Sequence, residues 1–172
     1  MTILNDFKAK AQWLYGGCTA PLVIRAILSD ASLCMLTYRS MAFFNRHVLT
    51  RPVAAVLLKA NAILCGAVIG RGASFGNKFV ILHSVGIVVN SKVAGGENIV
   101  LESGVVIGEE KRGCPVLGNN IYIGSGAKIF GAITIGNNVT IGANAVVNKS
   151  LPDNAVAVGV PAEIIRYKLP SE

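Results

Sequence analysis

The sequence predicts a parallel β-solenoid of about five coils behind an N-terminal region of α-helices. Of fifteen positions spaced six residues apart from Ile63 to Val147, all except Lys111 hold an apolar residue. Because the chain is 52% hydrophobic, only about eight such positions are expected by chance. A six-residue period matches neither the 3.6-residue period of a helix nor the two-residue alternation of a strand. Glycine also recurs one position after the series, at Gly70, Gly76, Gly118, Gly124, Gly136 and Gly142.

Residues 1–61 are expected to form the helical region. Its net charge is +5 over residues 1–60, against +2 for residues 61–172. We expect the helices to cover the open edge of the first coil, because an unpaired edge strand requires a cap. Peripheral contact of the basic helices with an anionic membrane is the alternative. Nucleic acid is not an expected partner, because no basic run is interleaved with aromatic residues. Four segments have helical length and apolar spacings of three and four: Ile3–Tyr15, Pro21–Leu28, Ser32–Phe44 and Arg51–Lys59.

Residues 62–152 are expected to form the solenoid, and residues 153–172 a C-terminal tail. Each hexapeptide supplies one short strand and one turn, and three hexapeptides make a triangular coil of about 18 residues. Successive coils then pair strand on strand at about 4.8 Å. Glycine and asparagine at the corners accept the positive φ that sharp turns require. A second inward-pointing position, usually small or apolar, is expected four residues after the series, as at Ala67, Ala73, Val85, Ala127, Val139 and Ala145.

The composition favours a cytoplasmic protein with reduced thiols. The four cysteines are too far apart for a CxxC metal pair, and the chain shows no secretory signal with a cleavage site. A membrane span is not expected, because basic and acidic residues interrupt every long apolar stretch of the N-terminal third. If the basic helices contact lipid, the protein lies at the inner face of the membrane.

Candidate chemistry lies where the repeat is imperfect. His83 is the only histidine in the repeat region, and an imidazole with a reference pKa of about 6.5 can remove a proton from an attacking hydroxyl. A solvated corner histidine is the alternative interpretation. The second imperfection is the polar segment 108–115 around Lys111.

Five segments over about 100 residues resemble the hexapeptide-repeat acyltransferases, and in detail the serine O-acetyltransferases. The resemblance implies a left-handed parallel β-helix, a homotrimer or a dimer of trimers, acetyl-CoA as the acetyl donor, and active sites in grooves between neighbouring prisms. It also implies that His83 is the general base. The segments are His83–Val89, Gly108 with the loop to Pro115, Ile123–Gly131, Ile141–Val147 and Val158–Ala162.

The chain departs from the serine-specific pattern at several positions. Leu82 and Ala62 stand where that family has aspartates, Cys114 replaces a histidine before the loop proline, and Gly113 replaces an arginine. Asp30 loosely matches an acceptor-binding aspartate of the family. The sequence is more similar to the colanic-acid and exopolysaccharide O-acetyltransferases, which share an apolar residue before the histidine and a Cys-Pro pair in the loop. A sugar hydroxyl is therefore the expected acceptor.

The resemblance also suggests roles for other residues. Gly108, Ser125 and Ala143 match positions that line the coenzyme A groove, and Arg166 and Lys168 are expected near its phosphates unless they belong to a solvated tail. Glu109, Cys114 and Asp30 are expected to orient His83 or to contact the acceptor. No metal site is expected, since a zinc site on such a prism needs three histidines.

Three functions remain open from the sequence. The first is direct acetyl transfer from acetyl-CoA to a sugar hydroxyl in surface or exopolysaccharide biosynthesis, without an acyl-enzyme, since no Ser, His and Asp constellation is visible. The second is serine O-acetylation for cysteine synthesis. The third is a catalytically inactive saccharide-binding module.

Overall fold

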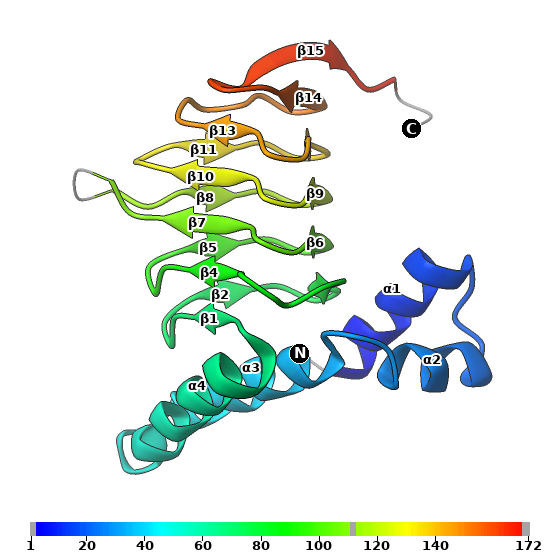
Figure 1. Cartoon of the computed structure of the whole chain (residues 1–172), viewed down its shortest axis with the longest axis vertical. Helices are drawn as coiled ribbons and strands as arrows, with labels where there is room; N and C mark the ends of the chain where they lie inside the picture. Colours follow the sequence, from blue (N-terminus) through cyan, green and yellow to red (C-terminus); the bar gives the residue numbers. More distant parts are fainter. Residues whose placement is uncertain (1–2, 111–112, 170–172) are drawn as a thin grey trace.

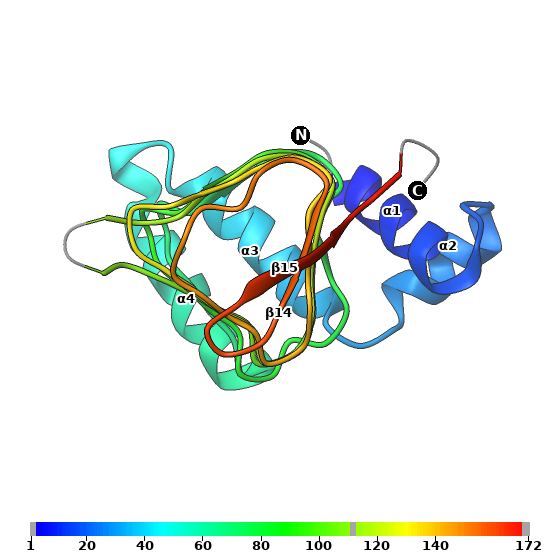
Figure 2. The ribbon, with the colours of Figure 1, turned by 90° about the horizontal axis from the view of Figure 1, so that it is seen from above.

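The chain folds as a three-sided prism of parallel strands that stands on a layer of helices (Figure 1). The computed structural model describes residues 3–110 and 113–169. The prism confirms the predicted solenoid and matches a left-handed β-helix, with coils piled along the long axis of the molecule. Seen from above, α3 passes beneath the prism, whereas α1 and α2 lie to one side of it (Figure 2).

The helices agree closely with the predicted segments. The second and fourth begin with a proline in the first turn, where the missing N–H has no helical partner to lose. The fourth continues past the expected end at Lys59 and stops at Gly66, which takes a left-handed conformation at φ 64°. The elements are α1 (Ile3–Tyr15), α2 (Ala20–Ile27), α3 (Ser32–Phe44), the 3₁₀ turn η1 (Val48–Thr50) and α4 (Arg51–Cys65).

Three sheets form the sides of the prism. Sheet A contains β1 (Val68–Ile69), β4 (Val88–Val89), β7 (Val106–Gly108), β10 (Lys128–Phe130) and β13 (Val146–Val147). Sheet B contains β2 (Ser74–Phe75), β5 (Ala94–Gly95), β8 (Val116–Leu117) and β11 (Thr134–Ile135). Sheet C contains β3 (Val80–Ile81), β6 (Ile99–Leu101), β9 (Ile121–Ile123), β12 (Thr140–Ile141), β14 (Ala155–Val158) and β15 (Glu163–Tyr167).

The prism contains slightly fewer complete coils than the expected five. Four coils have a strand in every sheet, whereas in the fifth the sheet B strand is reduced to a single bridge between Ile135 and Leu151. The segment after residue 152 is not a loose extension of the fold. Its strand β14 completes the last coil, and β15 pairs with β14 in the antiparallel direction, so that it covers the open upper edge of sheet C.

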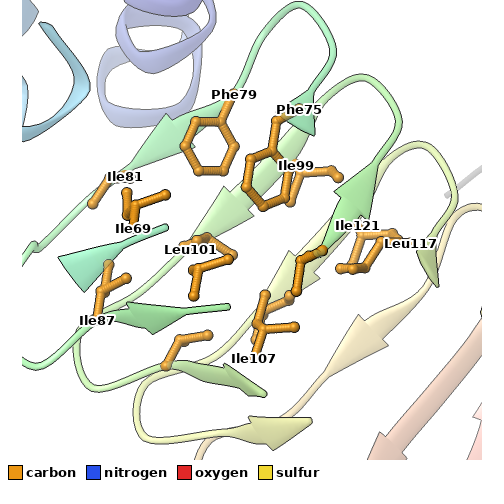
Figure 3. Packing of buried hydrophobic residues seen from close by; sticks show 14 of the residues in the cluster. Ile69, Phe75, Phe79, Ile81, Ile87, Ile99, Leu101, Ile107, Leu117 and Ile121 are labelled. Carbon is orange, nitrogen blue, oxygen red and sulfur yellow. The ribbon is translucent and has the colours of Figure 1, made fainter. Parts of the chain in front are cut away.

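The interior is a stack of aliphatic side chains with an aromatic base (Figure 3). Described residues of the six-residue series from Ile69 onward are buried, whereas Lys111 lies outside the described residues. Near the base, Phe75 and Phe79 stack with ring centroids 4.2 Å apart. Above Phe75 the paired position is Gly95, where a Cβ would come within 2.5 Å of the ring. The phenyl group thus occupies the space of two residues.

Two predicted interior positions are wrong. Ile63, the first residue of the series, lies on α4 and is 80% exposed, because the helix continues through it and the first strand begins only at Val68. Val85 is 70% exposed because it belongs to a widened corner between β3 and β4. The aliphatic stack therefore begins at Ile69.

The coils are not of equal length. Val68 pairs with Val88 twenty residues later, and Val106 pairs with Lys128 twenty-two residues later, whereas the second and fourth coils hold eighteen residues. The two additional residues of the first coil lie at the corner that contains His83, and the four of the third coil lie in the segment between β7 and β8. Both irregularities flagged by the sequence are therefore real insertions in the prism.

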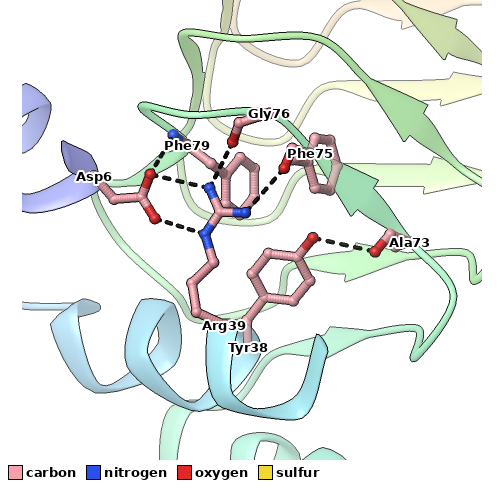
Figure 4. Close-up of polar contacts among 7 residues, drawn as sticks. All are labelled: Asp6, Tyr38, Arg39, Ala73, Phe75, Gly76 and Phe79. Atoms are coloured by element: carbon pink, nitrogen blue, oxygen red, sulfur yellow. Dashed lines mark hydrogen bonds and ion pairs between the residues drawn. The ribbon is translucent and has the colours of Figure 1, made fainter. Parts of the chain in front are cut away.

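A buried ion pair attaches the helices to the lowest coil (Figure 4). Arg39 of α3 contacts the Asp6 carboxylate of α1, with Nε 2.6 Å from Oδ2, and Asp6 is 1% exposed. The guanidinium also donates to the carbonyls of Phe75 and Gly76, at 2.9 and 2.6 Å. Asp6 in turn accepts a hydrogen bond from the Phe79 amide at 3.0 Å. These contacts satisfy backbone groups at the lower edge of the prism, as expected for a helical cap.

One helical segment has the length and hydropathy of a membrane span among the described residues. It is Val48–Cys65, which comprises η1 and α4 and contains Arg51 and Lys59. The consecutive helices α2 and α3 pass the same test only together, and they meet at 86°. α4 packs on α3 and β1 through one face, and leaves Val53, Val56 and Leu64 exposed on the other.

We predict that Asp6→Ala lowers the free energy of unfolding by about 3 kcal/mol, because it leaves the Arg39 guanidinium buried without its counter-charge. Urea denaturation measures the change. Glu163→Ala on the exposed strand β15 is the matched removal of a carboxylate, and it should change stability by less than about 0.5 kcal/mol. Equal effects of the two substitutions would contradict a structural role for the ion pair.

Candidate active site

His83 lies at the corner between sheets C and A, in the widened connection between β3 and β4. Its Nδ1 is 2.8 Å from Oδ2 of Asp30, and both side chains are 60% exposed. Asp30 comes from the turn between α2 and α3, fifty-three residues earlier in the chain. The structure therefore brings together two of the residues that the sequence singled out.

The turn that carries Asp30 is held in place from beneath. The Lys10 ammonium of α1, which is buried, donates to the Asp30 carbonyl and to Ser32 Oγ, the latter at 3.1 Å. Burial lowers the pKa of Lys10 to about 8. The Ala31 amide donates to Asp30 Oδ1 at 2.7 Å, and Ala31 itself has a φ of +60°. These bonds leave Oδ2 of Asp30 directed at the imidazole.

The hydrogen bond with His83 is the main reason why the pKa of Asp30 lies below its ordinary value. The Ala31 amide and the charges of His83 and Lys10 act in the same direction, and partial desolvation opposes them. An ionised Asp30 can only accept, so Nδ1 of the imidazole carries the proton in this contact. The lone pair of the neutral imidazole is then on Nε2, the atom that would take a proton from an acceptor.

The segment between β7 and β8 forms a separate cluster at the corner between sheets A and B. Glu109 Oε1 accepts a hydrogen bond from Lys92 Nζ at 2.8 Å, and this bond raises the pKa of Lys92. Glu110 and Gly113 exchange backbone hydrogen bonds of 2.9 Å. Cys114 is partly buried, and desolvation raises the pKa of its thiol, which disfavours a thiolate nucleophile.

Within one chain, this loop cluster does not reach His83. The two groups lie at opposite ends of the sheet A strands, since His83 precedes β4 whereas Glu109 and Cys114 follow β7. Figure 2 shows the β7–β8 connection at the corner away from α1 and α2. An arrangement that joins His83 to Glu109 or Cys114 thus requires a second copy of the chain.

The residues matched to the coenzyme A groove divide between these corners. Ser125 and Ala143 lie at the same corner as His83, two and three coils above it, or about 10 and 14 Å along the prism at 4.8 Å per coil. Gly108 ends β7 near the loop cluster, and a Cβ there would meet no atom within 4 Å. At the top of sheet C, Arg166 is the pairing partner of Val156. The Lys168 amide donates to the Asn154 carbonyl at 2.8 Å, near the third corner.

Lys10 is the residue that the sequence did not single out. It positions Asp30, yet in the sequence it is one lysine of a basic amphipathic helix. Its burial depends on where α1 packs, and no local pattern reports that. Among residues 3–110 and 113–169, no group of three His, Cys, Asp or Glu side chains is placed to hold a metal ion.

The corner histidine and the triangular prism define the hexapeptide-repeat class of transferase folds. A serine acetyltransferase of Brucella abortus in complex with coenzyme A superposes with a TM-score of 0.85 over 97% of this chain and 68% of that one, at 24% identity. At this identity the likeness concerns the fold. No protein-family model matches the chain.

Two curated proteins are similar in sequence. The serine acetyltransferase of Mycobacterium tuberculosis is 39% identical over 134 residues, which are 73% of this chain and 58% of that protein. The putative colanic acid biosynthesis acetyltransferase WcaB of Escherichia coli is 38% identical over 143 residues, which are 76% of this chain and 88% of that protein. The chain therefore spans little more than half of the first relative and most of the second. It belongs to the acetyltransferase family that contains both, as the sequence motifs predicted.

We predict that His83→Ala raises the pKa of Asp30 toward its ordinary value of about 3.9, because it removes the largest cause of the depression. Carbon-13 NMR of the Asp30 carboxyl through an acid titration measures this pKa. An unchanged Asp30 midpoint in the variant would show that the contact is not formed in solution.

The same depression links the contact to stability. A carboxylate with a lowered folded-state pKa stabilises the fold above its unfolded pKa, and this contribution disappears as the pH falls through the folded value. The wild-type protein should therefore lose the Asp30–His83 contact only below pH of about 3.9. Because both groups are largely exposed, the contribution is small.

Proposed function

We propose that the protein is an acetyl-CoA-dependent O-acetyltransferase that acts on a saccharide hydroxyl. The observation that carries the proposal is the contact between His83 Nδ1 and Asp30 Oδ2, since it leaves Nε2 as the proton acceptor at an exposed corner of the prism. Membership in the acetyltransferase family supports acetyl as the transferred group. The coenzyme A complex of the Brucella enzyme supports the donor.

The proposed reaction is a single direct transfer. Nε2 of His83 takes the proton of the acceptor hydroxyl as its oxygen attacks the thioester carbonyl. The carbon–sulfur bond then breaks, and the proton leaves on the departing coenzyme A thiolate. Asp30 holds the imidazole in the required tautomer and stabilises the imidazolium that forms, without becoming protonated itself.

We propose that the donor lies along the column above His83. Ser125 and Ala143 project small side chains from that corner, which leaves room for an extended pantetheine arm beside the backbone. Arg166 lies at the top of sheet C, at the end of the prism where the phosphates would arrive. The backbone of Lys168 lies near the corner between sheets B and C, so its side chain would have to reach across the top of sheet C to meet them. Gly108, with its unobstructed Cβ direction, would line the opposite wall of the groove.

The choice of a saccharide over serine rests on absent carboxylates. Leu82 is buried in a small apolar cluster with Val80 and Val100, so an aspartate at this position would lack both solvent and a partner. Asp30 is already engaged with His83, and Ala62 lies within α4. The site thus offers a free amino acid fewer ammonium partners than the serine-specific pattern does. Serine O-acetylation remains the second candidate, because one relative carries that name.

We further propose that the working form is a homotrimer with active sites between protomers. The outer face of sheet A carries a column of partly exposed valines, Val68, Val88, Val106 and Val146, with Lys128 between the last two. Val53 and Val56 of α4 are also exposed. Three such faces around a common axis would bring the loop corner of one protomer to the His83 corner of the next. Glu109 and Cys114 would then reach a neighbour's site.

We assign the enzyme to the cytoplasm, because acetyl-CoA is available there. The four cysteines, which are free thiols, suit the reducing conditions of that compartment. We assign the exposed apolar residues of α4 to contact between protomers rather than to lipid, because α4 packs on β1, the first strand of sheet A.

We predict that His83→Ala lowers kcat by at least about 10²-fold while acetyl-CoA binding is kept. Asp30→Asn should give a smaller loss, because the imidazole remains but its tautomer is no longer enforced. Release of the coenzyme A thiol measures turnover, with L-serine and a panel of oligosaccharides as acceptors. Near-normal turnover of His83→Ala would overturn the mechanism. Turnover with serine but with no saccharide would overturn the acceptor assignment.

We predict that two inactive variants restore each other when mixed. His83→Ala removes the base, and Gly108→Trp fills the opposite wall at a glycine whose φ is not positive and whose Cβ direction is open. If each site takes His83 from one protomer and Gly108 from the next, random trimers regain about a quarter of the wild-type sites.

The variants are unfolded together and refolded, with each variant refolded by itself as the control. Light scattering should give the mass of three chains. No gain of activity in the mixed sample, with trimers formed, would place both residues in a single protomer's site.

A further inference from the structure

A pocket with a volume of about 560 Å³ lies outside the His83 corner. It is a partly open pocket between α1 and the outer face of sheet C. Val80 of β3 and Val100 of β6 form its apolar floor, and Trp13 of α1 forms one wall, with the indole stacked on Tyr122 at 5.2 Å. A volume of this size is in the range of small-molecule sites.

The rim of the pocket is polar and positively charged. Lys8 of α1 and Lys78 of the turn before β3 both line the pocket, and Gln12 and Asn98 supply amides. Neither lysine forms an ion pair with any residue in the described part of the chain. Two acids lie beside the residues of the pocket. Glu97 accepts a hydrogen bond from Asn77 at 3.1 Å, and Glu102 accepts one from Tyr122 at 3.4 Å. Neither carboxylate forms an ion pair with the two lysines.

Lys78 occupies a backbone position that disfavours lysine. Its φ is +60°. By the register of sheet C, the equivalent residue is asparagine in every later coil: Asn98, Asn120, Asn138 and Asn154, with φ between 55° and 64°. Asparagine tolerates this left-handed conformation, whereas a long side chain gains nothing from it. A residue that breaks a local rule at the mouth of a pocket is evidence for a role in that pocket.

We propose that this pocket binds a carboxylate-bearing saccharide, as the acceptor chain that extends toward His83. Pyranose rings place apolar C–H faces against the half-exposed indole of Trp13, and their hydroxyls pair with amides, while the two ammonium groups match carboxylates. Val80 and His83 are three residues apart on one strand and its corner, which is about 10 Å. The acceptor identity rests on the proposed function, but binding in the pocket does not require turnover.

A nucleotide is the competing occupant, since lysines also bind phosphate. We favour a saccharide because Tyr122 covers one face of the indole, and because the floor is formed by aliphatic rather than aromatic side chains. The pocket offers the amides and apolar surface that a chain of pyranose rings requires along its length.

Trp13 is the only tryptophan of the chain, so its emission reports on this pocket directly. Oligogalacturonate and oligoglucuronate are titrated into the full-length protein without acetyl-CoA, and each is compared with its carboxyl-reduced counterpart. Calorimetry provides a second readout. The charged chains should shift the emission and bind at least about tenfold more tightly than the reduced chains, as expected for a charge-assisted hydrogen bond.

Lys78→Asn is the decisive variant, because it installs the residue that the other coils use. Its melting temperature should equal or exceed that of the wild type, and its affinity for the charged chains should fall on the order of tenfold. Lys149→Asn, at a corner between the sheets A and B of the upper coils, is the matched control and should leave binding unchanged.

Three results would overturn the proposal. The first is equal binding of charged and reduced chains, or no emission change and no heat with any of them. The second is an equal loss of affinity in Lys78→Asn and Lys149→Asn. The third is tighter binding of uridine diphosphate than of any uronate chain. Turnover with serine only, together with uronate binding in the pocket, would sink the proposed acceptor and leave the binding site standing.

Discussion

The ion pair between Asp6 and Arg39 is the contact on which both the site and the pocket depend. The lowest coil of a β-solenoid exposes unpaired backbone groups, and here Arg39 and Asp6 take up several of them while joining α1 to α3. Once α1 is fixed, Lys10 reaches the Asp30 turn and Trp13 reaches Tyr122. A buried ion pair contributes little net stability when compared with apolar replacements. Here its contacts hold α1 and α3 in one arrangement against the lowest coil. That arrangement is what places a carboxylate beside the corner histidine.

The apolar six-residue series does not reveal that the pairing register of the coils shifts by two residues between the two insertions. The two additional residues at the His83 corner and the four between β7 and β8 amount to one whole hexapeptide, so the apolar series returns to phase after the second insertion. Between them, Ile87, Val93 and Ile99 occupy the other inward-pointing position, which is also apolar. Glycine marks the true register at two of the four pairing positions between the insertions. The partners Gly95 and Ile107 are followed by Gly96 and Gly108, whereas Val89 and Leu101 are followed by Asn90 and Glu102.

Helix positions and the solenoid could be predicted because they depend on local periodicity. α1 and α3 have the predicted bounds. The predicted end of α4 at Lys59 is too early, because the apolar residues of its last turns count toward the six-residue repeat. The contact between His83 and Asp30 could not be derived in this way, because it joins residues fifty-three positions apart and depends on Lys10 and on the packing of α1. Similarly, residues at opposite corners of one prism share a site only through a second protomer, which a single-chain pattern does not describe. Family motifs supplied the candidates, and the tertiary contacts distinguish among them.

The asparagine column shows how a repeat can carry functional information. At four of five equivalent turns, asparagine meets the demand of a positive φ, and its amides join neighbouring coils, as between Asn98 and Asn120 at 3.0 Å. Lys78, at the first of the five turns, gives up both advantages. Selection for stability would favour asparagine there too, so the retained lysine needs a compensating reason, and its position at the rim of the α1 pocket supplies one. In a fold whose coils impose the same demands at every level, the exceptional residue is therefore where binding should be sought first.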